Sequence, residues 1–218
     1  MSANGVPDER GTHQQLCNVG GGVDRRHNSL RDWLKAWLLN VCHVPWADHE
    51  QHVPAWDRWS QATHPTTRAL LFRTVQTAAG PVQEPVMQLE RAELDVAYRD
   101  DEGTEGYVDV AYTNATPEDA AKTLRAARTP GKAVSEREEQ KRKRYPPVNN
   151  PHAVLVPFCV EARGRLGAEV LPFLRQHAPV AEPQRSAALA RALREISIIT
   201  QQGLANLLLA AEPRPCAA

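Results

Sequence analysis

The sequence predicts an α/β fold, with a mixed β-sheet flanked by helices and an additional helix near the C-terminal end. Three observations predict it. Apolar residues recur at helical spacing over 28–42, they alternate with polar residues over 94–98 and 107–112, and they form a near-continuous run over 153–160. Such a run is typical of a strand that is covered on both faces. The expected element order is α-β-β-β-α-β-α.

The remaining elements are predicted from their start and stop signals. A capping box over 135–138 begins a helix that ends at Tyr145, before two prolines. A weakly alternating stretch over 82–89 predicts a strand, while 53–56 is a candidate strand and 67–76 is either a strand or a helical turn. Further helices are expected over 116–128, 168–177 and 183–211.

Composition excludes several classes of protein. The 218 residues are 42% hydrophobic, which is enough for one core, and their net charge is +0, so nucleic-acid binding would have to come from local patches. No run of eighteen apolar residues predicts a membrane span, and the N-terminal residues lack the apolar core of a secretory signal. The four cysteines follow no framework, which is typical of a reducing compartment. We expect an intracellular protein without a membrane partner.

The predicted hairpin over 94–112 carries two acids that bear on function. Alternation sets Asp95 on the face opposite Leu94 and Val96, and it sets Asp109 on the face opposite Val108. Merging the apolar faces sets the two carboxylates across from each other, where they repel unless a cation lies between them. Two interpretations stay open: solvated acids on an exposed face, or ligands of Mg²⁺ or Mn²⁺.

The basic helix that follows offers a positive partner. Lys141 lies three residues after Glu138 and four before Tyr145, so the three share one helix face. A lysine near two carboxylates suits phosphodiester hydrolysis, because it orients water and offsets transition-state charge. The alternative is a solvated or phosphate-contacting run, which we favour for Arg142 and Lys143.

Other residues have plainer interpretations. We expect His27 to be solvated beside two arginines, with phosphate contact as the alternative. Trp33 and Trp37, four residues apart, are expected in the core. Cys159 is expected to be a small buried hydrophobe.

Taken in order, 92–96, 108–111 and Lys141-x-x-Arg144-Tyr145 resemble a known motif set. It is that of the restriction-like endonuclease domain, of the PD-(D/E)xK superfamily, in site-specific non-LTR retrotransposon proteins. The resemblance implies a restriction-endonuclease-like sheet, metal ligation by Asp95 and Asp109, and Lys141 as the catalytic lysine, although Lys143 competes for that role. It also implies an upstream acid, either Glu50 or Glu84.

The same resemblance implies the partners and the domain limits. Residues 1–24 are expected to be flexible, 25–178 to form the endonuclease-like domain with an insertion around 55–80, and 183–211 to add a helix. His13 and Cys17 resemble half of a zinc knuckle; two ligands do not make a zinc site, so we expect no zinc here. The residues expected to bind DNA are Arg142, Lys143, Arg144, Arg163 and Arg165.

The implied function is Mg²⁺- or Mn²⁺-dependent nicking of DNA by a retrotransposon-derived endonuclease. It implies a parent reverse transcriptase or its RNA template as a partner, and a nuclear location in a eukaryote. The alternative is a catalytically inactive module of the same fold that binds DNA or another protein.

Overall fold

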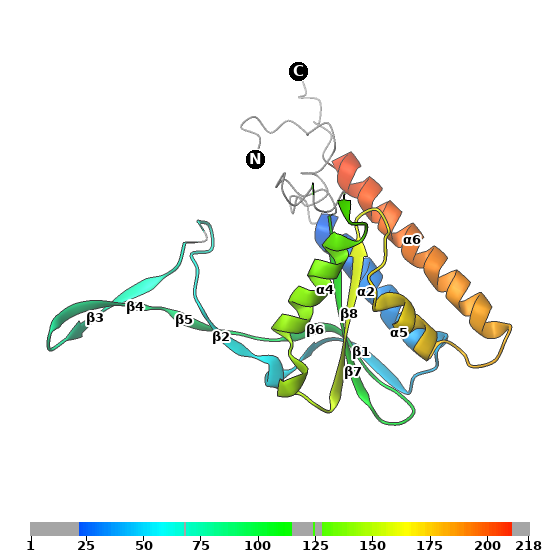
Figure 1. The fold of residues 1–218 in the computed structure, drawn as a ribbon, viewed down its shortest axis with the longest axis horizontal. Coiled ribbons are helices and arrows are strands. Elements are labelled where there is room, and N and C mark those ends of the chain that lie inside the picture. Colours follow the sequence, from blue (N-terminus) through cyan, green and yellow to red (C-terminus); the bar gives the residue numbers. More distant parts are fainter. Residues whose placement is uncertain (1–21, 68, 115–123, 125–127, 211–218) are drawn as a thin grey trace, which may run out of the picture. The chain divides into compact units, whose positions relative to one another are not determined.

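A computed structural model describes residues 22–67, 69–114, 124 and 128–210 (Figure 1). The chain divides into two compact units, one of Met1–Gln51 with Leu94–Ala218 and the other of His52–Glu93. The flexible segment predicted over 1–24 lies almost wholly outside the described residues, with His13 and Cys17. So does most of the helix predicted over 116–128.

The larger unit is built on a four-stranded sheet. Its strands are β1 (Trp46–His52), β6 (Glu93–Arg99), β7 (Glu105–Thr113) and β8 (Ala153–Glu161), in the order β1-β6-β7-β8. β6 and β7 pair antiparallel as a hairpin, whereas β7 and β8 pair parallel. Helix α4 (Lys132–Arg144) lies between β7 and β8 in sequence, as a parallel crossover requires. The predicted α/β class with a mixed sheet is confirmed.

The two faces of this sheet are covered by different helices. Helices α2 (Gly22–Asn40), α5 (Val170–His177) and α6 (Gln184–Ala210) share the main core with one face (Figure 1). Val110 and Phe158 belong to that core, while their neighbours Ala111 and Cys159 cluster with Val134 of α4. Because successive strand residues point to opposite faces, α4 covers the other face. The predicted long C-terminal helix is present as α6.

Two predicted elements differ in the structure. Helix α4 begins at Lys132 rather than at the Ser135 capping box, after Gly131 turns the chain with a φ of 82°. The Ser135 N–H already donates to the Gly131 carbonyl at 3.0 Å, so it needs no cap. The strand predicted over 82–89 is divided at Val86, whose backbone N–H and C=O bond two different segments, Leu71 and Ala62.

The smaller unit, inserted between β1 and β6 in sequence, consists of two antiparallel ribbons. β2 (Arg58–Gln61) pairs with β5 (Met87–Glu90), and β3 (Phe72–Thr77) pairs with β4 (Gly80–Pro85). The candidate strand over 53–56 is instead a 3₁₀ turn, η2 (Pro54–Trp56), with proline at its start. A second such turn, η3 (Pro147–Asn149), precedes β8. None of the helices that the structure describes has the length and apolar character needed to cross a bilayer.

Candidate active site

Asp95 lies where the β6–β7 hairpin opens. The paired register runs from Arg99 opposite Glu105 to Val96 opposite Val108, so the next facing positions are Asp95 and Asp109. Beyond that point the Val110 N–H donates to Asp95 Oδ2 at 2.7 Å. The Asp95 side chain is thus the acceptor for this N–H, where a strand backbone carbonyl would otherwise accept. Asp95 therefore occupies the gap between two diverging strands, and its side chain is 15% exposed.

Asp109 is buried under helix α4, where it meets Lys141. The Lys141 ammonium lies 2.8 Å from Oδ1 and 2.7 Å from Oδ2 of Asp109, and the two side chains are 16% and 5% exposed. Lys143 points elsewhere: it pairs with Glu139 at 2.7 Å and is 75% exposed. Of the two lysines that the sequence leaves in competition, Lys141 is the one that reaches the acids.

Burial dominates the electrostatics of Asp109. Desolvation raises the pKa of this carboxyl to about 6, more than the nearby Lys141 ammonium lowers it, and the adjacent Asp95 carboxylate raises it further. The two acids are therefore close enough to interact directly. Above about pH 6 Asp109 is a buried carboxylate beside the Lys141 ammonium. A buried carboxyl shifted by desolvation beside a specific charge partner is a candidate functional group.

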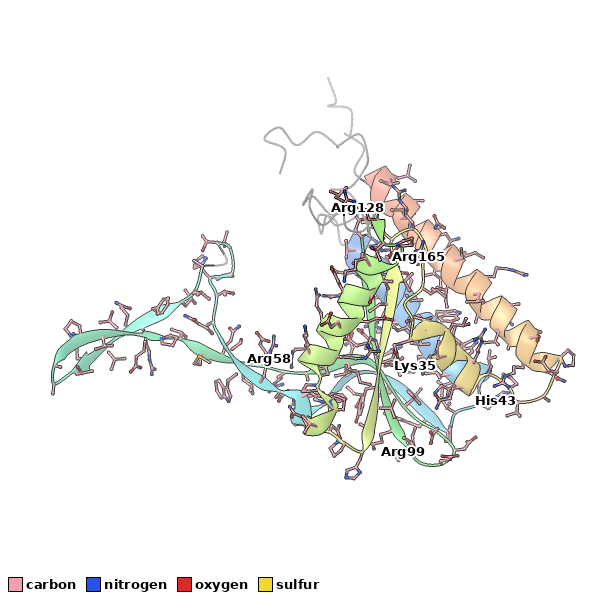
Figure 2. All side chains as sticks on the ribbon, in the orientation of Figure 1. Lys35, His43, Arg58, Arg99, Arg128 and Arg165 are labelled. Atoms are coloured by element: carbon pink, nitrogen blue, oxygen red, sulfur yellow. The ribbon has the colours of Figure 1, made fainter. Side chains whose placement is uncertain are left out.

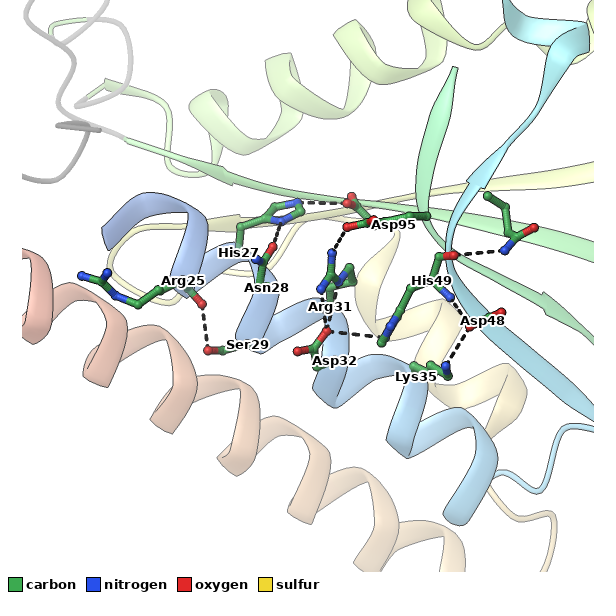
Figure 3. A network of polar contacts seen from close by, with 12 residues as sticks. Arg25, His27, Asn28, Ser29, Arg31, Asp32, Lys35, Asp48, His49 and Asp95 are labelled. Atoms are coloured by element: carbon green, nitrogen blue, oxygen red, sulfur yellow. Dashed lines mark hydrogen bonds and ion pairs between the residues drawn. The ribbon is translucent and has the colours of Figure 1, made fainter. Parts of the chain in front are cut away.

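His27 of α2 completes the arrangement around Asp95 (Figure 3). Its Nε2 lies 3.2 Å from Asp95 Oδ1 and 3.2 Å from the Val110 carbonyl oxygen, and its Nδ1 lies 3.3 Å from Asn28 Oδ1. Hydrogen bonding to Asp95 raises the pKa of His27 against the opposing effect of burial. The expectation that His27 is solvated is wrong, because Asp95, 68 residues further on, lies against it.

The two candidates for an upstream acid each have an ion-pair partner of their own. Glu50 pairs with Arg31 of α2, and Glu84 pairs with Arg73 at 3.2 Å across the β3–β4 ribbon. Among the residues that the structure describes, no group of three or more histidine, cysteine, aspartate or glutamate side chains could hold a metal ion. We therefore consider the two strand carboxylates, Asp95 and Asp109, as the candidate protein ligands.

Such a pair fits magnesium better than a metal that needs a full protein cage. Mg²⁺ takes hard oxygen ligands, retains several waters, and is commonly held by one or two carboxylates together with substrate phosphates. Asp95 and Asp109 offer that donor set, and Lys141 and His27 offset part of its charge.

Glu138 ties helix α4 to the start of α5. Its side chain is 3% exposed and accepts hydrogen bonds from the backbone N–H groups of Glu169, at 3.1 Å, and Ala168. A Cβ at Gly167 would come within 2.2 Å of Glu138 Oε1, so only glycine leaves room for this carboxylate. Because Glu138 and Lys141 lie three residues apart, this anchor also fixes the height of Lys141 over the sheet.

The residues expected to bind DNA divide between the two ends of α4. Arg142 pairs with Glu169, and the Arg144 guanidinium lies 4.9 Å from the Tyr145 ring centroid, both near the C-terminal end of the helix. Arg165 reaches the other end, with its Cδ 3.6 Å from the Cβ position at Gly131, and pairs with Glu161 at 3.5 Å. Figure 2 shows Arg165 far along the sheet from Arg99. Arg163, two residues before Arg165, accepts a bond from Gln201 through its carbonyl.

In comparisons with known proteins, no protein-family model matches the chain and no curated protein does either.

Proposed function

We propose that the chain is a Mg²⁺- or Mn²⁺-dependent endodeoxyribonuclease that nicks DNA by hydrolysing a phosphodiester. One observation carries this proposal: the buried Lys141–Asp109 ion pair lies beside a second strand carboxylate, Asp95. The order of these motifs, two strand acids and then a helix lysine, supports a restriction-endonuclease-like fold of retrotransposon origin. The four-stranded mixed sheet with a helix between β7 and β8 is compatible with that fold.

The roles follow from chemistry and position. Asp95 and Asp109 would hold the metal, which when bound lowers the pKa of water and offsets charge on the phosphate. Lys141 has three N–H donors, and the two Asp109 oxygens occupy at most two of them. The remaining donor can orient the attacking water or contact a phosphate oxygen as charge develops there.

Charge around the site can hold the DNA backbone. Arg142, Lys143 and Arg144 follow Lys141 directly, and Lys143 extends into solvent. Arg163 and Arg165 add positive charge near the opposite end of α4. Contacts of this kind attach to phosphates without reading sequence, and they weaken as salt rises.

A second candidate is an inactive module of the same fold that binds DNA or another protein. It is favoured by the contacts that both acids already make within the chain: His27 and Val110 engage Asp95, and the Lys141 ammonium lies within 2.8 Å of both oxygens of Asp109, of which Oδ1 accepts a hydrogen bond. An acid pair that has charged and hydrogen-bonding partners within the chain can serve stability alone.

Nicking of supercoiled plasmid in Mg²⁺ or Mn²⁺ tests the proposal. Asp109→Asn and Lys141→Met each remove one charge, and each should slow nicking by about 100-fold or more. Lys132→Met is the matched control on the same helix and should nick like the unmodified chain, because Lys132 is 43% exposed and pairs only with Glu136 among the ion pairs of the described residues.

Three outcomes separate the candidates. Metal-dependent nicking that both variants lose supports the nuclease. Salt-sensitive DNA binding without nicking by the unmodified chain overturns it in favour of the inactive DNA-binding module. Neither binding nor nicking overturns it in favour of a protein-interaction module.

A further inference from the structure

We infer that His27 is a positioning residue that holds Asp95 in the orientation for metal binding. The inference rests on the proposed function and extends it to a residue on a helix that carries none of the other proposed ligands. Three groups meet at the open end of the hairpin: the His27 ring, the Asp95 carboxylate and the Val110 backbone.

The hydrogen-bond directions are determined by chemistry. Both neighbours of His27 Nε2 are acceptors, the Asp95 carboxylate and the Val110 carbonyl, so Nε2 must carry the proton and donate. The Val110 N–H donates to the other oxygen of the same carboxylate. His27, Asp95 and Val110 therefore form a closed ring of hydrogen bonds, and each oxygen of Asp95 has one donor.

This ring of hydrogen bonds restrains the Asp95 side chain at the point where the β6–β7 pairing ends. Asp95 lies just beyond the last residue of β6 that pairs with β7 in the register, and Asp109, which directly precedes Val110, repels it. Without the His27 donor, Oδ1 loses its partner and the carboxylate can rotate away from Asp109. His27 thus restrains the carboxylate of Asp95, as Lys141 restrains the carboxylate of Asp109.

Metal binding is sensitive to such support. Groups that orient a ligating carboxylate commonly change metal affinity by about 10–100-fold when they are removed. A two-carboxylate site depends on the orientation of each acid more than a four-ligand cage does. We expect loss of the His27 donor to weaken metal binding first and the maximal nicking rate much less.

Two substitutions of similar polarity test whether the N–H donor at the position of His27 Nε2 is needed. In His27→Gln the amide nitrogen reaches about as far as Nε2, whereas in His27→Asn it reaches only about as far as Nδ1. Mn²⁺ binding to the full chain, followed by the electron paramagnetic resonance signal of free Mn²⁺, should weaken about 10–100-fold in His27→Asn and only a few-fold in His27→Gln. Ser29→Ala, an exposed change on the same helix, should bind Mn²⁺ as the unmodified chain does.

Nicking measured against Mg²⁺ concentration gives the second readout. His27→Asn should need about 10–100-fold more Mg²⁺ for half-maximal nicking, with a maximal rate within a few-fold of the unmodified chain. If His27→Asn binds Mn²⁺ normally, or if His27→Gln is no better than His27→Asn, the inference is overturned while the nuclease proposal stands. If the unmodified chain neither binds Mn²⁺ nor nicks, the proposed function itself fails.

Discussion

The two faces of the β6–β7–β8 sheet differ in what they bury. The face under α2, α5 and α6 is apolar and continuous, with Val96, Val108, Phe158 and Val160 packed against helix side chains. The face under α4 keeps only a small apolar cluster, and the buried charged groups Asp109 and Glu138 lie with it. The same strands supply both, one residue apart, so the difference arises from side-chain choice and not from backbone geometry.

That difference is what the proposed function would require of the face under α4. Burying a carboxylate costs free energy unless partners replace its water, and a well-packed apolar residue would often stabilise the fold as well or better. The α2 face shows that this sheet can be covered mainly by apolar contacts, with the buried polar residues Arg26 and Thr200 lying against Tyr112. Retaining an acid pair, a lysine and a second buried glutamate under α4 is most simply explained by function.

The apolar face should account for most of the stability. Phe158 is fully buried and packs edge-to-face on Phe173, with ring centroids 6.2 Å apart. Phe158→Ala should lower the free energy of unfolding by about 3–5 kcal/mol, measured by urea denaturation. The neighbouring change Cys159→Ala, on the α4 face, should cost far less, since it removes one sulfur atom. Equal losses for the two would contradict the division between the faces.

Glu138→Ala should give the next largest effect and should act through helix placement. It leaves two backbone N–H groups at the start of α5 without their acceptor in a buried setting. We expect a loss of about 3 kcal/mol in unfolding free energy, because each unsatisfied donor costs about 1–3 kcal/mol. Glu136→Ala, on the same helix, removes only a solvated pair with Lys132 and should change stability by less than about 0.5 kcal/mol. A comparable loss in both variants would show that Glu138 is not an anchor.

Asp109→Asn should make the stability of the metal-free chain less dependent on pH. The folded chain raises the pKa of Asp109 to about 6, so between about pH 4 and 6 the folded state binds more protons than the unfolded state. Asp109 therefore makes the wild-type chain less stable as pH rises through this window. Lys141 stays charged throughout, so its lost partner adds a constant cost in the variant. The unfolding free energy of the variant minus that of the wild type should rise by about 2–3 kcal/mol from pH 4 to pH 7, measured in EDTA.

A difference that is flat across that range would mean that Asp109 is ionised at low pH and that burial does not dominate its titration. If the unfolding free energy of the variant minus that of the wild type falls as pH rises, the pKa of Asp109 is lowered in the folded chain. The attraction of Lys141 then outweighs the effect of burial.

What could be predicted from the sequence is what local patterns encode. The hairpin, the facing positions of Asp95 and Asp109, and the buried strand β8 follow from period-two alternation and from one apolar run. The inward face of α4 follows from helical spacing, since Glu138 and Lys141 lie three residues apart. Lys141 and Lys143 can be told apart only when the helix is placed on the sheet.

What could not be predicted depends on contacts distant in sequence or on segments without a pattern. β1 reads Trp-Ala-Asp-His-Glu-Gln-His, which has no apolar alternation, because it pairs at a sheet edge through its backbone. His27 gives no signal of its role, since its partner Asp95 lies on another element. The β2–β5 ribbon follows long-range pairings such as Trp59 with Leu89, which no local window contains.

The smallest predicted effect is on the solvent-facing side of α4, where an exposed ion pair can be compared with the buried one on the side that faces the sheet. Lys143 and Glu139 form an i, i+4 pair 2.7 Å apart, close to the Lys141–Asp109 distance, but they are 75% and 62% exposed. A double-mutant cycle with Glu139→Ala and Lys143→Ala should give a coupling energy below about 0.5 kcal/mol that falls further in high salt. The corresponding cycle with Asp109→Asn and Lys141→Met should give a larger coupling that is less sensitive to salt, because both partners are shielded from solvent. Equal couplings would mean that the sheet does not shield the inner pair, and that the α4 face is a solvated surface.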